Sequence, residues 1–391
     1  MKVSLQPLSG RVTKEIPPFL QAEFWSNFKK GFGWTSLPFL LTSSPDAPIP
    51  LTIELRVLVR ALAGPFCFAY VPWGPAVGCP GAFRSELLTA IGRELRAHLP
   101  ALCLFVRFDP PWYDEEEPAT RDETLAETRS PRLIARPRFS LPLRKARSDV
   151  QPPDSVLLSI DRGENDILAS MKPKWRYNIK LAAKKGVSVA DEGTDGIPVF
   201  YRLYEETSKR DRIAIHPLAY YRKLFDTTPG LAGSPDLRLW IARHEGEPIA
   251  AIITLFFGET ATYLYGASSD VKRSLMPSYA LQWAAIRAAR EKGCRIYDLY
   301  GIPPADDPGH PMAGLYRFKT GFGGRVVHYA GSWDLPFSPL LYGIWTMAES
   351  LRAFWFKDLR KRLGRPARST ESEGVRASER ESASVENRER F

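Results

Sequence analysis

Cysteine and histidine are scarce in this sequence, and their spacing excludes several kinds of site. The 391 residues include four cysteines, none in a CxxC pair and none close to a histidine. Neither a zinc site nor a disulfide framework is therefore indicated, and a reducing, cytoplasmic setting fits this cysteine usage best. The five histidines are scattered as well, and no Ser/His/Asp arrangement accompanies them. We expect each histidine to be structural.

Long apolar runs are missing too. No stretch reaches the ~20 apolar residues that span a bilayer, and residues 1–19 lack the continuous apolar core of a signal peptide. The sequence therefore predicts neither a membrane-spanning helix nor export by a cleaved signal.

Hydrophobic residues and positive charge are abundant. With 44% hydrophobic residues the chain can bury sizeable cores, and its length favours two or three domains. The net charge of +10 favours a polyanionic partner. Composition leaves open whether that partner is a nucleic acid, a phosphorylated substrate or an anionic membrane face.

The first half alternates predicted strands and helices. We expect helices over residues 19–34 and 83–98, and strands over 51–61, 66–71 and 101–108. The last strand is a continuous apolar run that leads directly to Asp109. A carboxylate there faces the crevice in which α/β sheets bind ligands, but an aspartate before proline also forms turns. Residues 113–129 are acidic and predict a mobile loop, and a domain boundary is expected near residue 152.

The second half repeats this succession. Strands are expected over residues 155–160, 187–190, 237–243, 248–257, 261–266 and 295–299, and helices over 173–185, 197–209, 217–225 and 277–292. Hairpin strands followed by a helix and a strand occur in both halves, which indicates an internal duplication of one α/β unit. The order matches the acetyltransferase-like (GNAT-like) fold with a mixed sheet.

Basic residues recur at every fourth position along the helix that is expected to begin at Pro173. They are Lys172, Arg176, Lys180 and Lys184, and we call them the basic stripe. Such a stripe is commonly a solvated helix face, but this density of positive charge also suits phosphate binding.

The sequence AGLYRFKTGFGG, residues 313–324, sets one lysine between aromatic residues and glycines. A helix over 314–320 would place Tyr316, Lys319 and Thr320 on one face. The glycines that follow would end the helix and permit the close approach of a backbone or a substrate. We single out Lys319 as the candidate chemical centre, with a solvated surface lysine as the alternative.

A coenzyme A site is not indicated. Acyl-CoA enzymes of this fold hold the pyrophosphate on backbone amides at the start of the helix after the central strand, typically with an R/Q-x-x-G-x-G/A signature. The corresponding residues here read GASSDVKRSLMPSYA and lack the glycine pair. Another activated acyl carrier is therefore expected.

Seven motifs, taken together and in order, resemble those of the Fem family of aminoacyltransferases. They are FLQAEFWSNFK, FAYVPWGP, LFVRFDP, MKPKWRYNIKLAAKKGV, YLYGASS, YDLYGI and GLYRFKTGFGG, and the likeness extends over about residues 17–335. It implies two acetyltransferase-like domains and transfer of an amino acid from aminoacyl-tRNA to an amine of the peptidoglycan stem peptide, either on lipid II or on UDP-MurNAc-pentapeptide. No metal and no organic cofactor are implied.

The resemblance also assigns roles around the candidate lysine. Lys319, with Phe318 before it, matches the lysine of the family motif FKxGFGG, which implies that it steadies the oxyanion of the tetrahedral intermediate. Tyr263 and Tyr265 match the family's YxY and, two residues apart on one strand, are expected on one face near the acceptor peptide. Ordinary strand packing is the alternative for either tyrosine. Tyr316 is expected to contact substrate as well.

Further positions are expected to hold the acceptor. Lys29 and Asp109 match first-domain positions that contact the uridine-diphosphate or sugar part, and Arg212 and Arg210 match a basic position that meets the diphosphate. Asp109 is also a candidate base for the acceptor amine, with a tRNA hydroxyl or water as the alternative. The long coiled-coil arm of some relatives is absent, so tRNA contacts are expected from the basic stripe.

The expected domains are 1–152 for the acceptor and 153–335 for transfer. Residues 336–365 predict an amphipathic helix, either packed across the first domain or lying on the inner face of the membrane, and 366–391 predict a disordered tail. Two other functions stay open: aminoacylation of a different amine, and noncatalytic RNA binding. Whether glycine, alanine or serine is transferred is also open.

Overall fold

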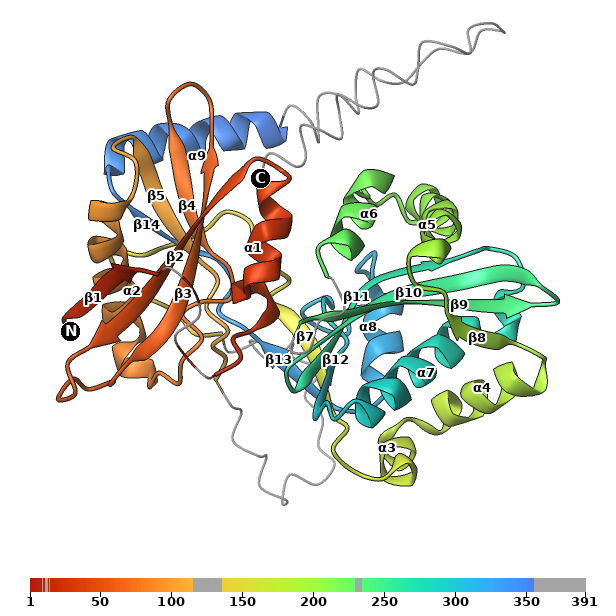
Figure 1. Ribbon diagram of the computed structural model, residues 1–391. Helices are drawn as coiled ribbons and strands as arrows, with labels where there is room; N and C mark the ends of the chain where they lie inside the picture. Colours follow the sequence, from red (N-terminus) through yellow and green to blue (C-terminus); the bar gives the residue numbers. More distant parts are fainter. Residues whose placement is uncertain (9, 11–12, 14, 115–135, 229–233, 355–391) are drawn as a thin grey trace, which may run out of the picture.

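The computed structural model describes residues 1–354, except 9, 11–12, 14, 115–135 and 229–233, and it contains two seven-stranded sheets (Figure 1). Sheet A contains β1 (Val3–Pro7), β2 (Trp34–Ser43), β3 (Thr52–Ala61), β4 (Cys67–Val71), β5 (Cys103–Phe108), β6 (Arg144–Lys145) and β14 (Trp333–Pro336). Sheet B contains β7 (Asp154–Ser159), β8 (Ser188–Asp191), β9 (Asp236–His244), β10 (Glu247–Phe257), β11 (Thr260–Ser268), β12 (Ile296–Asp298) and β13 (Arg325–His328). The α-helices are α1 (Glu23–Lys30), α2 (Gly81–Leu95), α3 (Glu164–Ser170), α4 (Pro173–Lys184), α5 (Ile197–Asp211), α6 (Leu218–Asp226), α7 (Pro277–Glu291), α8 (Ala313–Thr320) and α9 (Pro339–Phe354).

The two sheets have equivalent strand orders. Sheet A runs β1-β2-β3-β4-β5-β14-β6, and sheet B, read from its far end, runs β8-β9-β10-β11-β12-β7-β13. Each contains one parallel pair, β4 with β5 and β11 with β12, and a helix connects the two strands of each pair. The other ladders are antiparallel. The predicted duplication and the acetyltransferase-like fold of both halves are confirmed.

Local signals in the sequence explain where the helices begin and end. Pro173 and Pro277 occupy the first turns of α4 and α7. Proline is favourable there because the first backbone N–H groups of a helix have no acceptor within the helix, so no hydrogen bond is lost. Gly186 and Gly293 follow the ends of these helices with φ values of 78° and 88°, a conformation that glycine adopts without a steric penalty.

Four apolar clusters cover the faces of the two sheets. α2 packs on one face of sheet A, and α9 covers part of the other through Tyr342. α4 and α7 cover one face of sheet B. α5 and α6 cover the other face, where Phe24, Trp25 and Phe28 of α1 join the same cluster. The first domain therefore contributes a helix to the core of the second.

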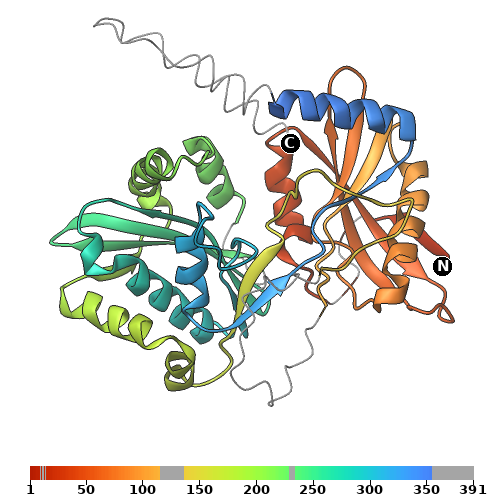
Figure 2. The ribbon, with the colours of Figure 1, turned by 180° about the vertical axis from the view of Figure 1, so that it is seen from behind.

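The chain passes between the domains twice. β7 follows the first domain and pairs with β12 of sheet B, while β14 follows the second domain and pairs with β5 of sheet A. The predicted second domain, 153–335, thus runs into a strand of sheet A, because Trp333–Pro336 returns to complete that sheet. Figures 1 and 2 show the two chain segments side by side between the domains.

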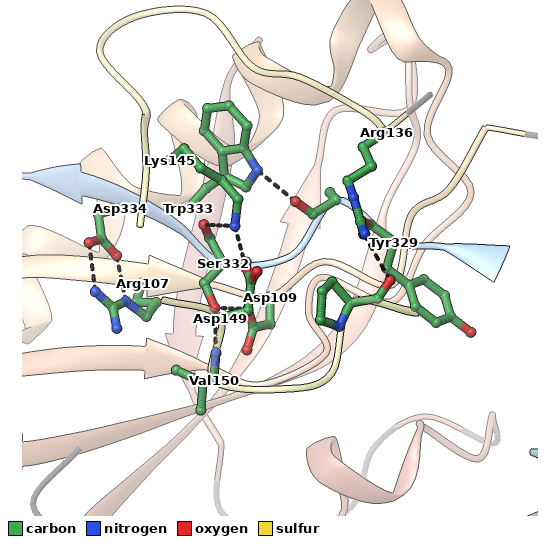
Figure 3. A network of polar contacts seen from close by, with 12 residues as sticks. Arg107, Asp109, Arg136, Lys145, Asp149, Val150, Tyr329, Ser332, Trp333 and Asp334 are labelled. Atoms are coloured by element: carbon green, nitrogen blue, oxygen red, sulfur yellow. Dashed lines mark hydrogen bonds and ion pairs between the residues drawn. The ribbon is translucent and has the colours of Figure 1, made fainter. Parts of the chain in front are cut away.

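A network of buried polar groups fixes the returning strand (Figure 3). Arg107 on β5 donates through two nitrogens to the carboxylate of Asp334 on β14, at 2.7 and 2.8 Å. The hydroxyl of Ser332 donates to Asp109 and accepts a bond from the backbone N–H of Val150 at 2.9 Å. These side chains join three segments that are distant in the sequence.

Several expectations concern the C-terminus and the loops. Within the predicted range 336–365 the structure contains the helix α9, and one side of it packs on sheet A of the first domain. Within the described part of the chain, no helix combines the length and apolar character needed to cross a membrane. Most of the predicted loop 113–129, and the whole predicted tail 366–391, lie outside the described residues.

Candidate active site

Lys319 is buried at the end of α8, with 6% of its surface exposed. Its ammonium donates to two backbone carbonyls, that of Tyr300 and, at 2.9 Å, that of Gly301. The ring of Tyr263 lies beneath it, with the nitrogen 5.0 Å from the ring centre. Lys319 is therefore held by a fixed cage rather than solvated at the surface.

An unusual backbone turn builds this cage. Tyr300 and Gly301 follow β12 and both have positive φ, 52° and 39°, and this conformation directs two successive carbonyls to one side of the chain. The N–H of Tyr300 donates to Asp298 at 2.8 Å, and the hydroxyl of Ser155 on β7 donates to the same carboxylate oxygen. Asp298 is 1% exposed, so the turn is supported from within the core.

Burial controls the charge of the site. It lowers the pKa of Lys319 to about 7, and the negative charge of Asp298 opposes this shift. Burial also raises the pKa of Asp298, against hydrogen bonds from Ser155 and from the Tyr300 N–H. An ammonium in such a site is desolvated and directional, which is the state in which a cation acts most strongly on developing charge.

The expectation that Tyr263 and Tyr265 share a face is wrong. The pairing of β10 with β11 slips at this point, so that Ile253 opposes Tyr265 and Thr254 opposes Tyr263. The intervening Leu264 is an extra residue in the ladder, and a β-bulge of this kind reverses the alternation of side chains. Tyr263 packs with the cluster beside Lys319, whereas Tyr265 packs on the opposite face of sheet B.

The start of α4 is tied to the end of α8. The indole N–H of Trp175 donates to the carbonyl of Phe318 at 2.9 Å, and the N–H of Lys172 donates to the carbonyl of Gly321 at 2.9 Å. A Cβ on Gly321 would lie 2.1 Å from the Trp175 ring, so only glycine fits there. The basic stripe therefore begins beside the helix that carries Lys319.

The members of the basic stripe differ in their surroundings. Lys172, Lys180 and Lys184 are exposed. Arg176 is half-buried and donates to the carbonyls of Leu168 and Ala169 at 3.4 Å, at the end of α3. Arg176 thus stabilises a helix end, and three lysines form the exposed part of the stripe.

Asp109 lies behind the surface, with 2% of its area exposed. Tyr70 donates to one of its oxygens at 2.5 Å and Ser332 donates to the other. Burial raises its pKa to about 6, while these two hydrogen bonds act to lower it. Both oxygens are engaged inside the protein, so an acceptor amine has no direct approach to this carboxylate in the structure.

A chain of hydrogen bonds connects Asp109 to the lysine cage across the two domains. The hydroxyl of Tyr300 donates to Gln151 Oε1 at 2.5 Å, and Gln151 Nε2 donates to the hydroxyl of Tyr70 at 3.1 Å. Tyr70 in turn donates to Asp109. Each donor points toward the buried carboxylate, and Gln151 stands at the crossing between the two domains. We call these four residues the interdomain chain.

Two of the residues expected to hold the acceptor lie on α1 and at the end of α5. Lys29 on α1 has its ammonium 5.4 Å from the ring centre of Trp25 and 5.8 Å from that of Tyr220 on α6. Arg210 is engaged with Asp211, Asp270 and the carbonyl of Ser268.

The remaining two positions lie on α8 and at the end of α5. Arg212 follows α5 with a φ of 55° and is exposed. Its side chain forms no hydrogen bond or ion pair with the part of the chain that the structure describes, so of the two arginines it is the one available to a diphosphate. Tyr316 is half-buried against the cluster beside Lys319.

Sequence reasoning missed Asp298, Tyr300 and Gln151. Asp298 closes a short buried strand just as Asp109 follows one, so the argument made for LFVRFDP applies equally to YDLYGI. Gln151 has no comparable signal, because its importance comes only from partners 81 and 149 residues away.

Comparison with known proteins gives one consistent result. A model of the FemAB family matches residues 13–232 and 239–350. Lipid II:glycine glycyltransferases of Staphylococcus epidermidis and Staphylococcus aureus are 21% and 22% identical in alignments of 254 and 256 positions, which cover 49% of this chain. The chain spans 60 to 61% of the length of these relatives. The crystal structure of FemX is similar with a TM-score of 0.65 and 18% identity, over 84% of this chain and 94% of that one.

Two sheets of equivalent strand order, each with one parallel pair, define the class as a tandem acetyltransferase-like protein. Within that class the chain belongs to the FemAB family, whose model covers most of its length.

Proposed function

We propose that this protein transfers an amino acid from aminoacyl-tRNA to an amine of the peptidoglycan stem peptide, forming an interpeptide bridge or branch. The acceptor would be carried on lipid II or on UDP-MurNAc. The observation that carries the proposal is the caged ammonium of Lys319. Membership of the FemAB family and the names of the lipid II:glycine glycyltransferases support the choice of substrate class.

The chemistry follows from the needs of ester aminolysis. The acceptor nitrogen attacks the ester carbonyl carbon, negative charge develops on the carbonyl oxygen, and the C–O bond to the tRNA ribose then breaks. An ammonium has three N–H groups, and two of those on Lys319 are directed to Tyr300 and Gly301. The third is assigned to the oxyanion, and the cage holds it in place without reorganisation. The departing ribose oxygen takes a proton as the amine loses one.

The donor would approach along α4. Lys172, Lys180 and Lys184 offer exposed positive charge that leads to α8, and phosphate contacts of this kind position a nucleic acid without reading its sequence. Trp283 of α7 and Lys180 also line a groove of about 570 Å³ beside the stripe. An aromatic ring next to a cation suits an unpaired base.

The direct test is a transfer assay with the purified full chain. Labelled glycyl-, alanyl- and seryl-tRNA are each supplied with UDP-MurNAc-pentapeptide or lipid II, and label on the muropeptide is the expected result. Lys319→Met should lower turnover about 100-fold or more, the usual effect of removing one oxyanion donor. Lys272→Met, which removes a surface lysine paired with Glu245 and Glu247, should leave turnover unchanged.

The same assay separates the other functions. Label on a different amine only would assign a different acceptor, and tRNA binding without turnover on any amine would assign noncatalytic RNA binding. Replacing the three exposed lysines of the basic stripe with glutamate, and leaving Arg176 to cap α3, should weaken tRNA binding. The slope of its salt dependence should also fall by about one for each phosphate that a lysine no longer neutralises. Unchanged affinity would remove the stripe from the donor site.

A further inference from the structure

The outer face of α9 is apolar along its whole described length. Over residues 339–351 the side chains that face solvent are Pro339, Leu340, Gly343, Ile344, Met347, Ala348 and Leu351. Leu340 is 74% exposed, Ile344 52%, Met347 61% and Leu351 63%. These four large side chains follow the helical spacing of three and four residues, so they form one continuous strip, which we call the α9 strip.

Over residues 339–351, the polar side chains of the helix lie away from the α9 strip. Thr346, Glu349 and Ser350 are only partly exposed. Burial acts to lower the pKa of Arg107, but the hydrogen bond and charge of Asp334 raise it, and the charge of Glu349 adds to this rise. Ser350 accepts a hydrogen bond from Arg147. A helix on the surface of a water-soluble domain places its polar face outward, so α9 has the reverse arrangement on its exposed side.

Packing on sheet A does not need the α9 strip. Tyr342 is buried against Phe105, with ring centres 5.4 Å apart, and its hydroxyl donates to Asp334 at 2.9 Å. Leu341 and Trp345 pack against the same cluster. Figures 1 and 2 show α9 lying across the outside of the first domain. The described part of the chain therefore leaves the α9 strip exposed, and we infer that an apolar surface outside this part covers it.

The positive charge of the sequence after α9 indicates which kind of surface covers the α9 strip. The sequence that follows α9 contains Lys357, Arg360, Lys361, Arg362 and Arg365, with Asp358 as the only acid among residues 357–365. Residues 366–391 contain almost no apolar side chains, so they are unsuited to covering the strip. A second copy of the chain would bring two such basic runs together. An anionic bilayer satisfies both features, because its acyl chains accept the strip and its headgroups attract the cations.

We propose that the α9 strip is a membrane-docking surface for anionic phospholipid. The chain would lie on the bilayer through one side of a helix, and the positive charge of the sequence that follows would favour anionic headgroups. This inference deepens the proposed function, since a chain held at the membrane meets the lipid-linked form of its acceptor. It gives the first domain a partner, the anionic membrane surface. The transfer chemistry of Lys319 does not by itself require that partner.

Vesicle binding by the full chain tests the proposal without any substrate. The variant carries Leu340→Gln, Ile344→Gln, Met347→Gln and Leu351→Gln, and the matched control carries Ile16→Gln and Val271→Gln, at positions with 54% and 55% exposure elsewhere. In sedimentation with vesicles of phosphatidylglycerol and phosphatidylcholine, the natural chain and the control should bind alike. The affinity of the variant for these vesicles should fall about tenfold or more. Vesicles of phosphatidylcholine alone should bind all three proteins weakly.

A second measurement does not depend on the multiple variant. The four native cysteines are buried, so Ile344→Cys introduces one accessible thiol for a polarity-sensitive fluorophore. Its emission should shift to shorter wavelength on anionic vesicles, whereas the same label at Val271→Cys should not respond. No sedimentation of the natural chain, equal binding by the Gln variant, or a dimer that the Gln variant abolishes in the absence of vesicles would each overturn the proposal. Failure of the transfer assay would leave vesicle binding intact, so the two ideas fail separately.

Discussion

The chemistry of Lys319 is set by two opposing effects at a single nitrogen. Burial removes water and favours the neutral amine, while Asp298 and the carbonyls of Tyr300 and Gly301 favour the ammonium. A pKa of about 7 lies where both forms are populated near neutral pH. As a cation the residue would stabilise an oxyanion, and as a neutral amine it would accept a proton from the acceptor.

The pH dependence of turnover distinguishes these two roles. The ammonium predominates at pH values well below 7 and is lost as the pH rises through about 7. If the cation acts, its contribution falls over this range, although deprotonation of the acceptor amine raises the rate at the same time. Lys319→Arg removes this ambiguity because a guanidinium stays charged. We expect the ratio of natural to Lys319→Arg turnover to fall with rising pH, measured from pH 6 to about 8.5. A ratio that rises instead would identify Lys319 as a base.

At the scale of elements, signals confined to a few residues predicted the structure well. The helices α1, α4, α7 and α8 lie where aromatic periodicity, proline starts and glycine stops placed them. β2 is not among the predicted strands. Its sequence contains Pro38, and a proline argues against a strand in the middle of a sheet. It nevertheless pairs with both β1 and β3.

Elements that depend on distant partners could not be predicted from local pattern. The bulge at Leu264 appears only when β11 is set against β10, and it reverses the face on which Tyr265 lies. β14 is a short segment that forms a strand because β5 and β6 leave a place between them. The local sequence of Trp333–Pro336 gives no signal that this segment pairs with sheet A.

The strength of β14 rests on its one buried charge pair. Asp334 is 0% and Arg107 5% exposed, so removing either partner leaves an uncompensated charge in the core. Asp334→Ala should therefore lower the free energy of unfolding by about 3–5 kcal/mol, seen as a lower midpoint in urea. The double change Arg107→Met with Asp334→Leu removes both charges and should recover most of the loss. As a comparison, Asp306→Ala breaks only the exposed pair with Arg317 and should cost less than about 1 kcal/mol. Equal losses for both single variants would contradict the assigned role of the pair.

At the scale of the whole molecule, the two domains meet beside the candidate site. α1 lends aromatic side chains to the core of the second domain, β14 returns to the first, and the interdomain chain links Asp109 to the turn that cages Lys319. Lys319 could be selected from its sequence motif alone. Its hydrogen-bonded connection to the first domain could not, because the connecting residues meet only after both crossings have formed.

The interdomain chain therefore predicts that a change in one domain alters chemistry in the other. Tyr70→Phe and Gln151→Leu should each lower kcat about tenfold, because the Tyr300–Gly301 turn loses its anchor and small displacements of a positioned group are costly. Tyr300→Phe keeps the carbonyl that holds Lys319 and removes only the hydroxyl, and should have the same effect.

Combined substitutions show whether the residues of the interdomain chain act on kcat through one shared connection or independently. Combining Gln151→Leu with Tyr300→Phe should reduce kcat no further than either change alone, since both break the same connection. Tyr297→Phe is the matched control, because it removes a buried tyrosine–glutamine bond of 2.8 Å, to Gln282, that lies wholly within the second domain. It should lower stability by about 1–3 kcal/mol and combine additively with Gln151→Leu. If the Gln151 and Tyr300 changes multiply instead, the two domains act on Lys319 independently, and the chain of hydrogen bonds is structural only.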